Sequence, residues 1–437
     1  MTGLAVLAAV FVCYSLVAAR LDRWSITAPM VFVATGVLIG PEGPTSVGFV
    51  DDPEAVKIVA ELTLALLLFA DASTLEWSKV RGDRSLTARL LLIGFPLTVL
   101  SGLGAGLWLA PAAGWAGAAL IASILAPTDA ALGLGVFTNR AVPGRIRRAL
   151  NVESGLNDGM ATPLVMLFLS VLAAHEGLGP ANWLAESARE LGIAVLAAVV
   201  VGLGSGYLLS AARDRGFTSE TSDRLAVLAA ALLAYGGSVA VGGNGFVAAF
   251  VAGLLFSAAS RGRFHEAAEF TEDAGLFSSF LVWTLFGALL VGPQLSGEVE
   301  ASTIAYALLS LTVVRMIPVA IAMIGSGLRP SSIAFMGWFG PRGLASVVFT
   351  LIAFESLHES GLASEGLIAV ATWTVLLSVL AHGVSARPLS AIYGRVVADA
   401  AVENQTMGSP DETHLPRSLT AQKSRRRDTE LPSSDPH

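Results

Sequence analysis

Long apolar runs separated by short polar segments make up most of the chain. Each run approaches the roughly 20 residues that an α-helix needs to cross a bilayer. The pattern predicts an all-α polytopic membrane protein with about 13 transmembrane helices within residues 1–390. The runs lie at residues 3–19, 25–40, 56–72, 88–110, 115–136, 150–174, 189–211, 224–241, 244–259, 274–292, 302–325, 332–355 and 365–386.

The basic residues are unevenly divided between the two sets of loops. Of the 27 lysines and arginines, 23 fall in every second loop or in the C-terminal tail, and only Lys57 and Arg189 fall in the opposite loops. The other two, Arg315 and Arg342, lie inside predicted helices. Because cytoplasmic loops carry the excess of positive charge, the N-terminus is predicted outside and the C-terminus in the cytoplasm.

The composition agrees with a chain that mostly avoids water. Charged residues make up 14% of the chain, against about 25% in a soluble domain. The single cysteine, Cys13, excludes an intrachain disulfide, and the six histidines show no metal-ligand spacing. The first run has no basic segment before it, so we expect a retained helix and not a signal peptide. Residues 397–437 are polar and predict a disordered cytoplasmic tail.

Three of the predicted helices contain residues that lipid disfavours. A charge at bilayer depth costs about 2.5–3.5 kcal/mol on insertion scales, so each one indicates a function or a partner. The stretches are APTDA in run 115–136, NVESGLND in run 150–174 and GPRG in run 332–355. They contain Pro127, Thr128, Asp129, Glu153, Ser154, Asn157, Asp158, Gly340, Pro341, Arg342 and Gly343.

The charges of these stretches fall at similar depths. With the predicted orientation, Asp129 lies about 10 Å from the cytoplasmic end of its helix, Asp158 about 12 Å and Arg342 about 15 Å. The same rise per residue places Glu153 only about 5 Å deep. The first three therefore approach the midplane of a hydrocarbon core about 30 Å thick, and we expect them to form one site.

Helix periodicity and helix breakers add detail to this site. Ser154 and Asp158 are four residues apart and share a helix face, so a hydroxyl and a carboxylate can meet one ion. Pro127 and the GPRG sequence both interrupt helical hydrogen bonding. They predict that the fifth and twelfth helices are broken at the midplane and belong to inverted repeats, because such breaks free carbonyls to coordinate a cation.

Three other polar residues inside the runs are weaker candidates. Asp71 and Arg315 are read as structural residues, since buried charges in membrane helices are most often paired. His382 is read as a packed neutral histidine.

These motifs, in this order, resemble one family. TDA at 128–130, ESGLNDG at 153–159 and GPRGLAS at 340–346 are similar to sequences of the NhaP-type sodium/proton antiporters, within the monovalent cation/proton antiporter superfamily. The resemblance covers roughly residues 1–390. Many relatives have TDP where this chain has TDA, and here Pro127 precedes Thr128.

The resemblance implies a role for each site residue. Asp129 and Asp158 would bind a monovalent cation and a proton in competition, with Ser154 and the Thr128 carbonyl completing the ion shell. Asn157 stands where electrogenic relatives have an aspartate, which implies electroneutral exchange. An ion pair between Glu153 and Arg342 would hold their two helices together.

The resemblance also implies an assembly. We expect a homodimer in the cell (inner) membrane, with helices 1–3 and 7–10 forming the dimerisation part and helices 4–6 and 11–13 the transport core. The activity would be exchange of Na⁺ or Li⁺ for H⁺ by alternating access in pH homeostasis. No cofactor and no nucleic-acid partner are expected.

Several other functions remain as alternatives. A K⁺/H⁺ antiporter would use the same residues for another ion. A cation channel needs a continuous pore, whereas three charges in one place would trap an ion. A membrane sensor would need an output domain. An enzyme is not expected, because no nucleophile–base pair stands out.

Overall fold

The computed structural model describes residues 2–44, 53–74, 85–130, 132, 136, 139, 141–173, 180–359 and 365–406. Within those ranges every regular element is a helix, which confirms the all-α class predicted from the sequence. Each of the thirteen apolar runs overlaps a helix of the structure. Residues 131 and 133–135 of run 115–136 lie outside the described residues.

Some helices are continuous, and others contain a π-helical turn. The continuous helices are α1 (Thr2–Arg23), α2 (Ala28–Ile39), α3 (Pro53–Thr74), α8 (Gly144–Ala173), α11 (Glu220–Ala240), α12 (Gly245–Ser260) and α19 (Glu365–Thr406). Those with a π turn are η1 (Leu90–Gly94) with α5 (Phe95–Leu109), α9 (Pro180–Ala198) with η5 (Val199–Leu203) and α10 (Gly204–Asp214), and α13 (His265–Phe286) with η6 (Gly287–Val291) and α14 (Gly292–Ser296).

The remaining helices stop inside an apolar run. They are α6 (Gly114–Ile124), preceded by the 3₁₀ turn η2 (Pro111–Ala113), then α15 (Ala301–Leu311) with α16 (Val313–Ala322), and α17 (Pro330–Trp338) with α18 (Leu344–Glu359). The chain is non-helical from 125 to 130 after α6 and from 339 to 343 between α17 and α18. We call these the first and the second crossing segment.

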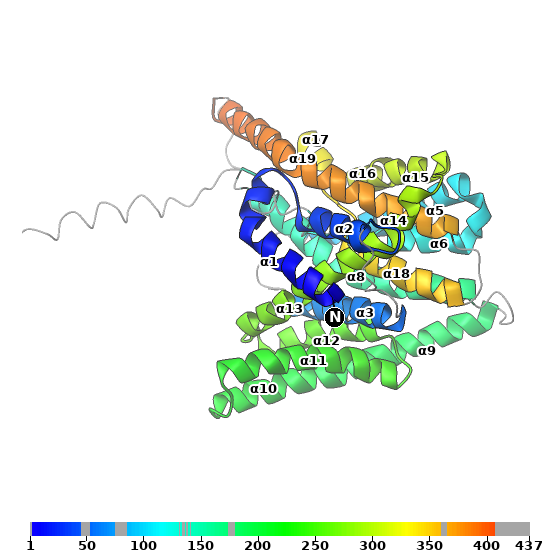
Figure 1. The fold of residues 1–437 in the computed structure, drawn as a ribbon. Coiled ribbons are helices and arrows are strands. Elements are labelled where there is room, and N and C mark those ends of the chain that lie inside the picture. The colour runs from blue at the N-terminus through cyan, green and yellow to red at the C-terminus, as the bar shows by residue number, and fades with distance from the viewer. Residues whose placement is uncertain are drawn as a thin grey trace, which may run out of the picture.

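The helices form a bundle with α8 and α18 between two groups. Figure 1 shows α9, α10, α11 and α12 together on one side and α5, α6, α15 and α16 on the other. Residues 116–128 and 339–353 are buried without interruption. A helix that is apolar on all sides belongs in the centre of a bundle. Both crossing segments therefore adjoin the most enclosed helices of the molecule.

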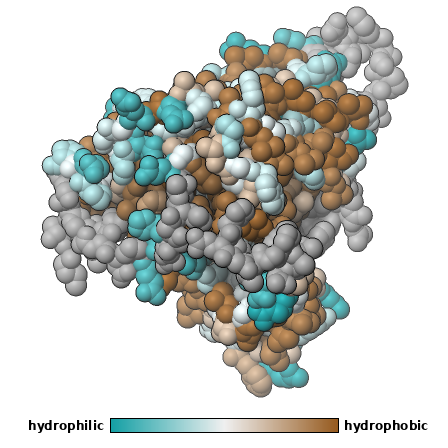
Figure 2. All heavy atoms as spheres, turned by 90° about the vertical axis from the view of Figure 1, so that its right-hand side faces the viewer, coloured by the Kyte–Doolittle hydropathy of each residue, from teal (hydrophilic) through white to brown (hydrophobic). Residues whose placement is uncertain are grey.

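The outside of the bundle is strongly apolar. Large areas of the surface in Figure 2 are hydrophobic, and Leu16, Val200 and Leu208 are 72–80% exposed. Eight helices are long and apolar enough to cross a membrane, and four shorter apolar helices accompany them in the described residues. Exposed apolar side chains on such helices are stable against lipid, so the chain is a multi-pass membrane protein.

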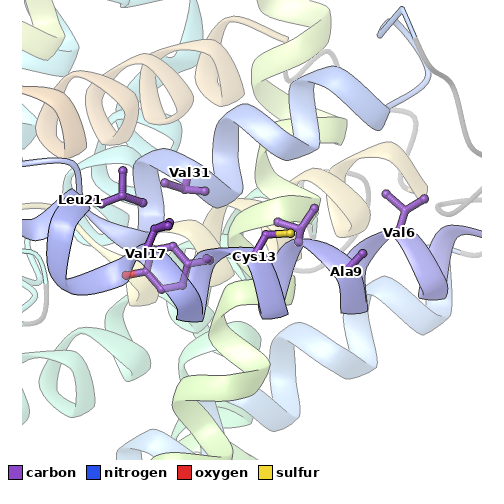
Figure 3. A pocket seen from close by; sticks show the side chains of 8 residues that line it. Val6, Ala9, Cys13, Val17, Leu21 and Val31 are labelled. Carbon is purple, nitrogen blue, oxygen red and sulfur yellow. The ribbon is translucent and has the colours of Figure 1, made fainter.

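An apolar groove of about 380 Å³ lies beside α1. Figure 3 shows it between α1 and α2. None of the predicted site residues lines it, so it is separate from the charged centre. Its lining residues are Val6, Ala9, Val10, Cys13, Tyr14, Val17, Leu21 and Val31.

The C-terminal tail differs from the prediction at its start. α19 continues through Thr406, so the described part of the segment beginning at residue 397 is helical and not disordered. The sequence ADAAVEN follows the last apolar turn of α19. It contains no glycine or proline that would end the helix. Residues 407–437 lie outside the described residues.

Candidate functional site

Backbone hydrogen bonds join the two crossing segments. The Asp129 N–H donates to the Pro341 carbonyl at 2.8 Å. The Leu344 N–H donates to the Asp129 carboxylate oxygen Oδ2 at 3.0 Å. Leu344 is the first residue of α18, where N–H groups lack helical partners and the helix dipole favours negative charge. The Asp129 carboxylate thus lies at a helix N-terminus.

Two glycines allow this close approach. A Cβ atom on Gly343 would overlap Cβ and Oδ2 of Asp129. A Cβ atom on Gly340 would lie 2.5 Å from Nε of Arg315 and 3.0 Å from Cγ2 of Thr128. The glycines of GPRG therefore make room for the side chains of the first crossing segment.

Arg342 is fully buried and donates to main-chain oxygens. Its Nη1 lies 2.9 Å from the Ala126 carbonyl and 3.4 Å from the Pro127 carbonyl, and its Nη2 lies 3.2 Å from the Ser310 carbonyl. Ser310 stands at the C-terminal end of α15 and Ala126 just after α6. Carbonyls at helix ends lack helical partners and attract positive charge. The guanidinium thus binds both helix ends.

Glu153 forms its ion pair with Arg315. The contacts are bidentate, with Nη1 to Oε1 at 2.6 Å and Nη2 to Oε2 at 2.9 Å, and both side chains are at most 2% exposed. The predicted partner, Arg342, is therefore wrong. The Arg342 guanidinium binds carbonyls instead, whereas Arg315 lies in the first turn of α16 and reaches α8.

Asn157 and Ser154 of α8 hold the first crossing segment from the other side. Asn157 donates through Nδ2 to Thr128 Oγ1 at 2.7 Å and accepts from the Thr128 N–H at 3.3 Å. The hydroxyls of Thr128 and Ser154 lie 3.1 Å apart. The Asn157 amide is thus engaged as donor and acceptor, and the Thr128 main chain is fixed against α8.

Asp158 lies one turn after Ser154 on α8. Its Oδ1 is buried and has no hydrogen-bond partner among the described residues. The charges of Asp129 and Asp71 both act on this carboxyl. Asp71 approaches from α3, since a Cβ on Gly155 would lie 3.6 Å from the Asp71 Cβ. An unpartnered buried carboxylate oxygen is costly unless a proton or a cation occupies it.

The site therefore brings together residues far apart in the chain. Asp129, Thr128, Ser154, Asn157 and Asp158 meet where the first crossing segment touches α8 and α18. No group of three or more His, Cys, Asp or Glu side chains suited to a bound metal is found in the described ranges. The oxygen set of hydroxyls and carboxylates suits a hard cation.

Comparison with known proteins gives the family. Residues 6–391 match the family described as sodium/hydrogen exchanger, transmembrane. The chain belongs to this family. The resemblance drawn from the three motifs is confirmed, and membership in a transporter family agrees with the expectation that the chain is not an enzyme.

Individual relatives of this exchanger-family chain are distant. It is 27% identical over 386 residues to a K⁺/H⁺ antiporter, NhaP2, of Shewanella sp. (strain ANA-3), covering 87% of this chain and 64% of that protein. It is 25% identical to a Na⁺/H⁺ antiporter of Schizosaccharomyces pombe, covering 83% of this chain and 84% of that protein. The chain thus spans about 64% of the length of the Shewanella relatives.

A solved structure has the same fold. The sodium proton antiporter MjNhaP1 from Methanocaldococcus jannaschii at pH 8 matches with a TM-score of 0.72 and 21% identity. The match covers 90% of this chain and 99% of the other. The all-helical arrangement is therefore an exchanger fold.

The sequence interpretation of the exchanger site missed several contacts. Ser346 of GPRGLAS donates from its hydroxyl to the Ile124 carbonyl at 2.6 Å, which satisfies the last residue of α6. Ser310 accepts from Arg342 through its carbonyl, which no side-chain pattern can indicate. Ser378 contacts the second crossing segment at Arg342, and His382 contacts the Trp338 carbonyl just before it. Their spacing of four residues within an apolar run was a visible signal.

We expect the Glu153–Arg315 pair to support folding. Arg315→Ala leaves the Glu153 carboxylate buried without its partner, so the free energy of unfolding should fall by about 3–5 kcal/mol. Thermal unfolding of the purified protein in detergent measures the effect as a lower Tm. Removal of both partners should cost less than the sum of the single losses.

A matched control is the exposed pair of Arg224 and Glu220 on α11. Because exposed ion pairs contribute about 0–1 kcal/mol, Arg224→Ala should leave the Tm nearly unchanged. Equal Tm changes for Arg315→Ala and Arg224→Ala, or strictly additive losses in the double variant, would contradict the structural role of the buried pair.

Proposed function

We propose that this chain is a secondary transporter that exchanges a monovalent cation, Na⁺ or Li⁺, for a proton by alternating access. The observation that carries the proposal is the buried, unpartnered Oδ1 of Asp158 beside Asp129. Family membership supports antiport as the activity. Because one carboxylate oxygen accepts either a proton or a cation, binding of one expels the other.

Each neighbour of Asp158 has a part in this exchange. Ser154 supplies a hydroxyl oxygen from the same face of α8, and Thr128 supplies its carbonyl from the first crossing segment. Asp129 adds a second carboxylate, which lies at the N-terminus of α18. Asp71 adds a third acid close to the site. The oxygens replace part of the hydration shell that the cation loses on entering.

The transport cycle needs a defined topology. In the proposal the chain crosses the membrane thirteen times, with the N-terminus outside and the C-terminus in the cytoplasm. The interrupted helices α6 and α17–α18 are the fifth and twelfth crossings and are counterparts in inverted repeats. The protein is a homodimer in the cell membrane, and the helices around the crossing segments move against the rest.

K⁺/H⁺ exchange is a second candidate. It is favoured by the Shewanella relatives, which are named K⁺/H⁺ antiporters. The Schizosaccharomyces pombe relative, by contrast, is named a Na⁺/H⁺ antiporter. The same oxygens serve both ions, so the two candidates differ only in ion preference.

Reconstituted vesicles test the proposal. Purified protein is placed in vesicles with an internal pH dye, and Na⁺, Li⁺, K⁺ or choline is added outside. We expect proton release with Na⁺ or Li⁺ and none with choline. Release with K⁺ alone establishes the second candidate. An unchanged internal pH with all three metal ions rules out cation/proton exchange.

We expect the exchange to be electroneutral. Asn157 is a neutral amide already bound to Thr128, so Asp158 is the group that carries one positive charge per half-cycle. If one net charge moved, 100 mV would contribute about 2.3 kcal/mol per turnover, about fifty-fold at equilibrium. Vesicles clamped with potassium and valinomycin, with Na⁺ exchanged, should give the same final gradient at zero and at negative potential. A gradient that shifts with voltage overturns the reading of Asn157.

A further inference from the structure

One face of α19 carries three polar side chains in the middle of the helix. Ser378, His382 and Ser385 are spaced by four and three residues and so share that face. Ser378 and His382 are at most 1% exposed. Buried polar groups need partners, and each of these residues finds one near the second crossing segment.

Ser378 and His382 bind the main chain at both ends of that segment. The Arg342 N–H donates to Ser378 Oγ at 2.6 Å. His382 Nε2 lies 2.9 Å from the carbonyl oxygen of Trp338, the last residue of α17. The Trp338 carbonyl lies at the C-terminal end of α17, and the Arg342 N–H lies in the non-helical segment. Neither group has a hydrogen-bond partner within a helix, so each needs one from elsewhere.

Both ring nitrogens of His382 have hydrogen-bond partners. A carbonyl only accepts, so a proton on Nε2 donates to the Trp338 oxygen. Nδ1 lies 3.2 Å from the Ser378 hydroxyl and 3.0 Å from the Ser378 carbonyl, so it accepts from the hydroxyl or donates to the carbonyl.

The result is a chain of three hydrogen bonds across the break. It runs from the Arg342 N–H to the Ser378 hydroxyl, from that hydroxyl to His382, and from His382 to the Trp338 carbonyl. α19 thereby fixes the length and direction of the segment between α17 and α18. The same segment holds Asp129 through the Pro341 carbonyl and the Leu344 N–H.

We propose that Ser378 and His382 are positioning residues of the cation site, which act by holding the second crossing segment where it binds Asp129. This inference rests on the proposed exchange function. In the described residues neither side chain has a hydrogen bond to Asp129 or Asp158, so we assign neither as an ion ligand. Their loss lets Pro341 and Leu344 shift, and Asp129 shifts with them. The affinity for the cation then falls, whereas the rates of the later steps of the cycle change less.

The test separates apparent affinity from turnover. Wild-type vesicles must first show cation-dependent proton release, since without it the proposed function fails and not the positioning role. Initial rates are then measured over a range of Na⁺ concentrations for Ser378→Ala, His382→Ala and His382→Gln. Loss of a buried hydrogen bond of this kind corresponds to about a tenfold change in an equilibrium constant.

We expect His382→Ala and Ser378→Ala to raise the KM for Na⁺ about tenfold with the maximal rate changed less than about threefold. His382→Gln keeps a donor for the Trp338 carbonyl and should restore most of the affinity. Ser385→Ala is the matched control, because Ser385 accepts only from the Trp338 indole Nε1 at 3.0 Å. Its KM should stay at the wild-type value.

Other outcomes overturn the proposal. An unchanged KM in Ser378→Ala and His382→Ala shows that the two residues only fill space. A loss of maximal rate at constant KM, or equal KM changes in Ser385→Ala, shows a general effect on α19. Where His382→Ala gives no folded protein, Ser378→Ala decides the question, because it removes the hydroxyl between Arg342 and His382 and keeps the ring.

Discussion

Asp158→Asn should abolish cation-dependent proton release while the protein still folds and inserts. Asparagine has nearly the shape of aspartate, so packing on α8 is kept. It cannot ionise, and so it neither takes up a proton nor offers a charged oxygen to the cation. Because Oδ1 of Asp158 has no hydrogen-bond partner in the described part of the chain, no structural bond is broken. Vesicles with the variant should show no pH change above the choline background.

Asp273→Asn is the control, since Asp273 is an exposed carboxylate on α13. It should exchange at the wild-type rate. Size-exclusion profile and Tm of Asp158→Asn should match those of the wild type, which shows that the loss is not one of folding. Retention of most of the wild-type exchange by Asp158→Asn would remove Asp158 from the ion site and with it the observation on which the proposed function rests.

The helical architecture could be predicted from the sequence because each helix depends on the residues of its own segment. A bilayer requires about 20 apolar residues per crossing, and each run shows this length without reference to any other part of the chain. Residues at 128, 129, 154 and 158 could be grouped because lipid makes each polar residue costly, so their presence alone marks a site. Their similar depths followed from the helical rise.

The partner of Glu153 could not be read in the same way. Depth arithmetic left it about 10 Å short of Arg342 along the membrane normal, whereas family resemblance paired the two. The choice of Arg315 depends on the break at Thr312, which starts α16 with Arg315 in its first turn. It also depends on the carbonyls of Ala126 and Ser310, which bind Arg342. The helix break and the carbonyl contacts both depend on the tertiary structure, and no pattern of side chains in the sequence indicates them.

The polar face of α19 lies between these two cases. The spacing of Ser378, His382 and Ser385 is visible in the sequence, but only His382 was interpreted from it. What this face meets is the main chain of a broken helix, and main-chain groups leave no trace in a sequence. The sequence therefore predicts only a packed histidine at 382 and gives no sign of its contact with the Trp338 carbonyl at the end of α17.

Gly343→Ala should reduce exchange about a hundredfold, although residue 343 has no ionisable group. The added Cβ would overlap Cβ and Oδ2 of Asp129, and a Cβ cannot rotate away as the tip of a long side chain can. Asp129 or the second crossing segment must therefore move. A displacement of about 1 Å at a reacting or binding group costs about a hundredfold in rate. The rate of Na⁺-dependent proton release in vesicles measures the effect.

Backbone strain does not explain this expected loss, because Gly343 is not among the described glycines with positive φ. Gly104→Ala on α5 is the matched control, since a Cβ there meets no atom within 4 Å. Alanine is the better helix former by about 1 kcal/mol, so that variant should keep full exchange and gain slightly in Tm. If Gly343→Ala exchanged as fast as Gly104→Ala, Asp129 could not be held tightly against the second crossing segment. The hydrogen bonds from Leu344 and to Pro341 would then not set its position. A rate that falls only for Gly343→Ala, with folding intact, makes the close approach of these two segments the feature that positions Asp129 beside Asp158.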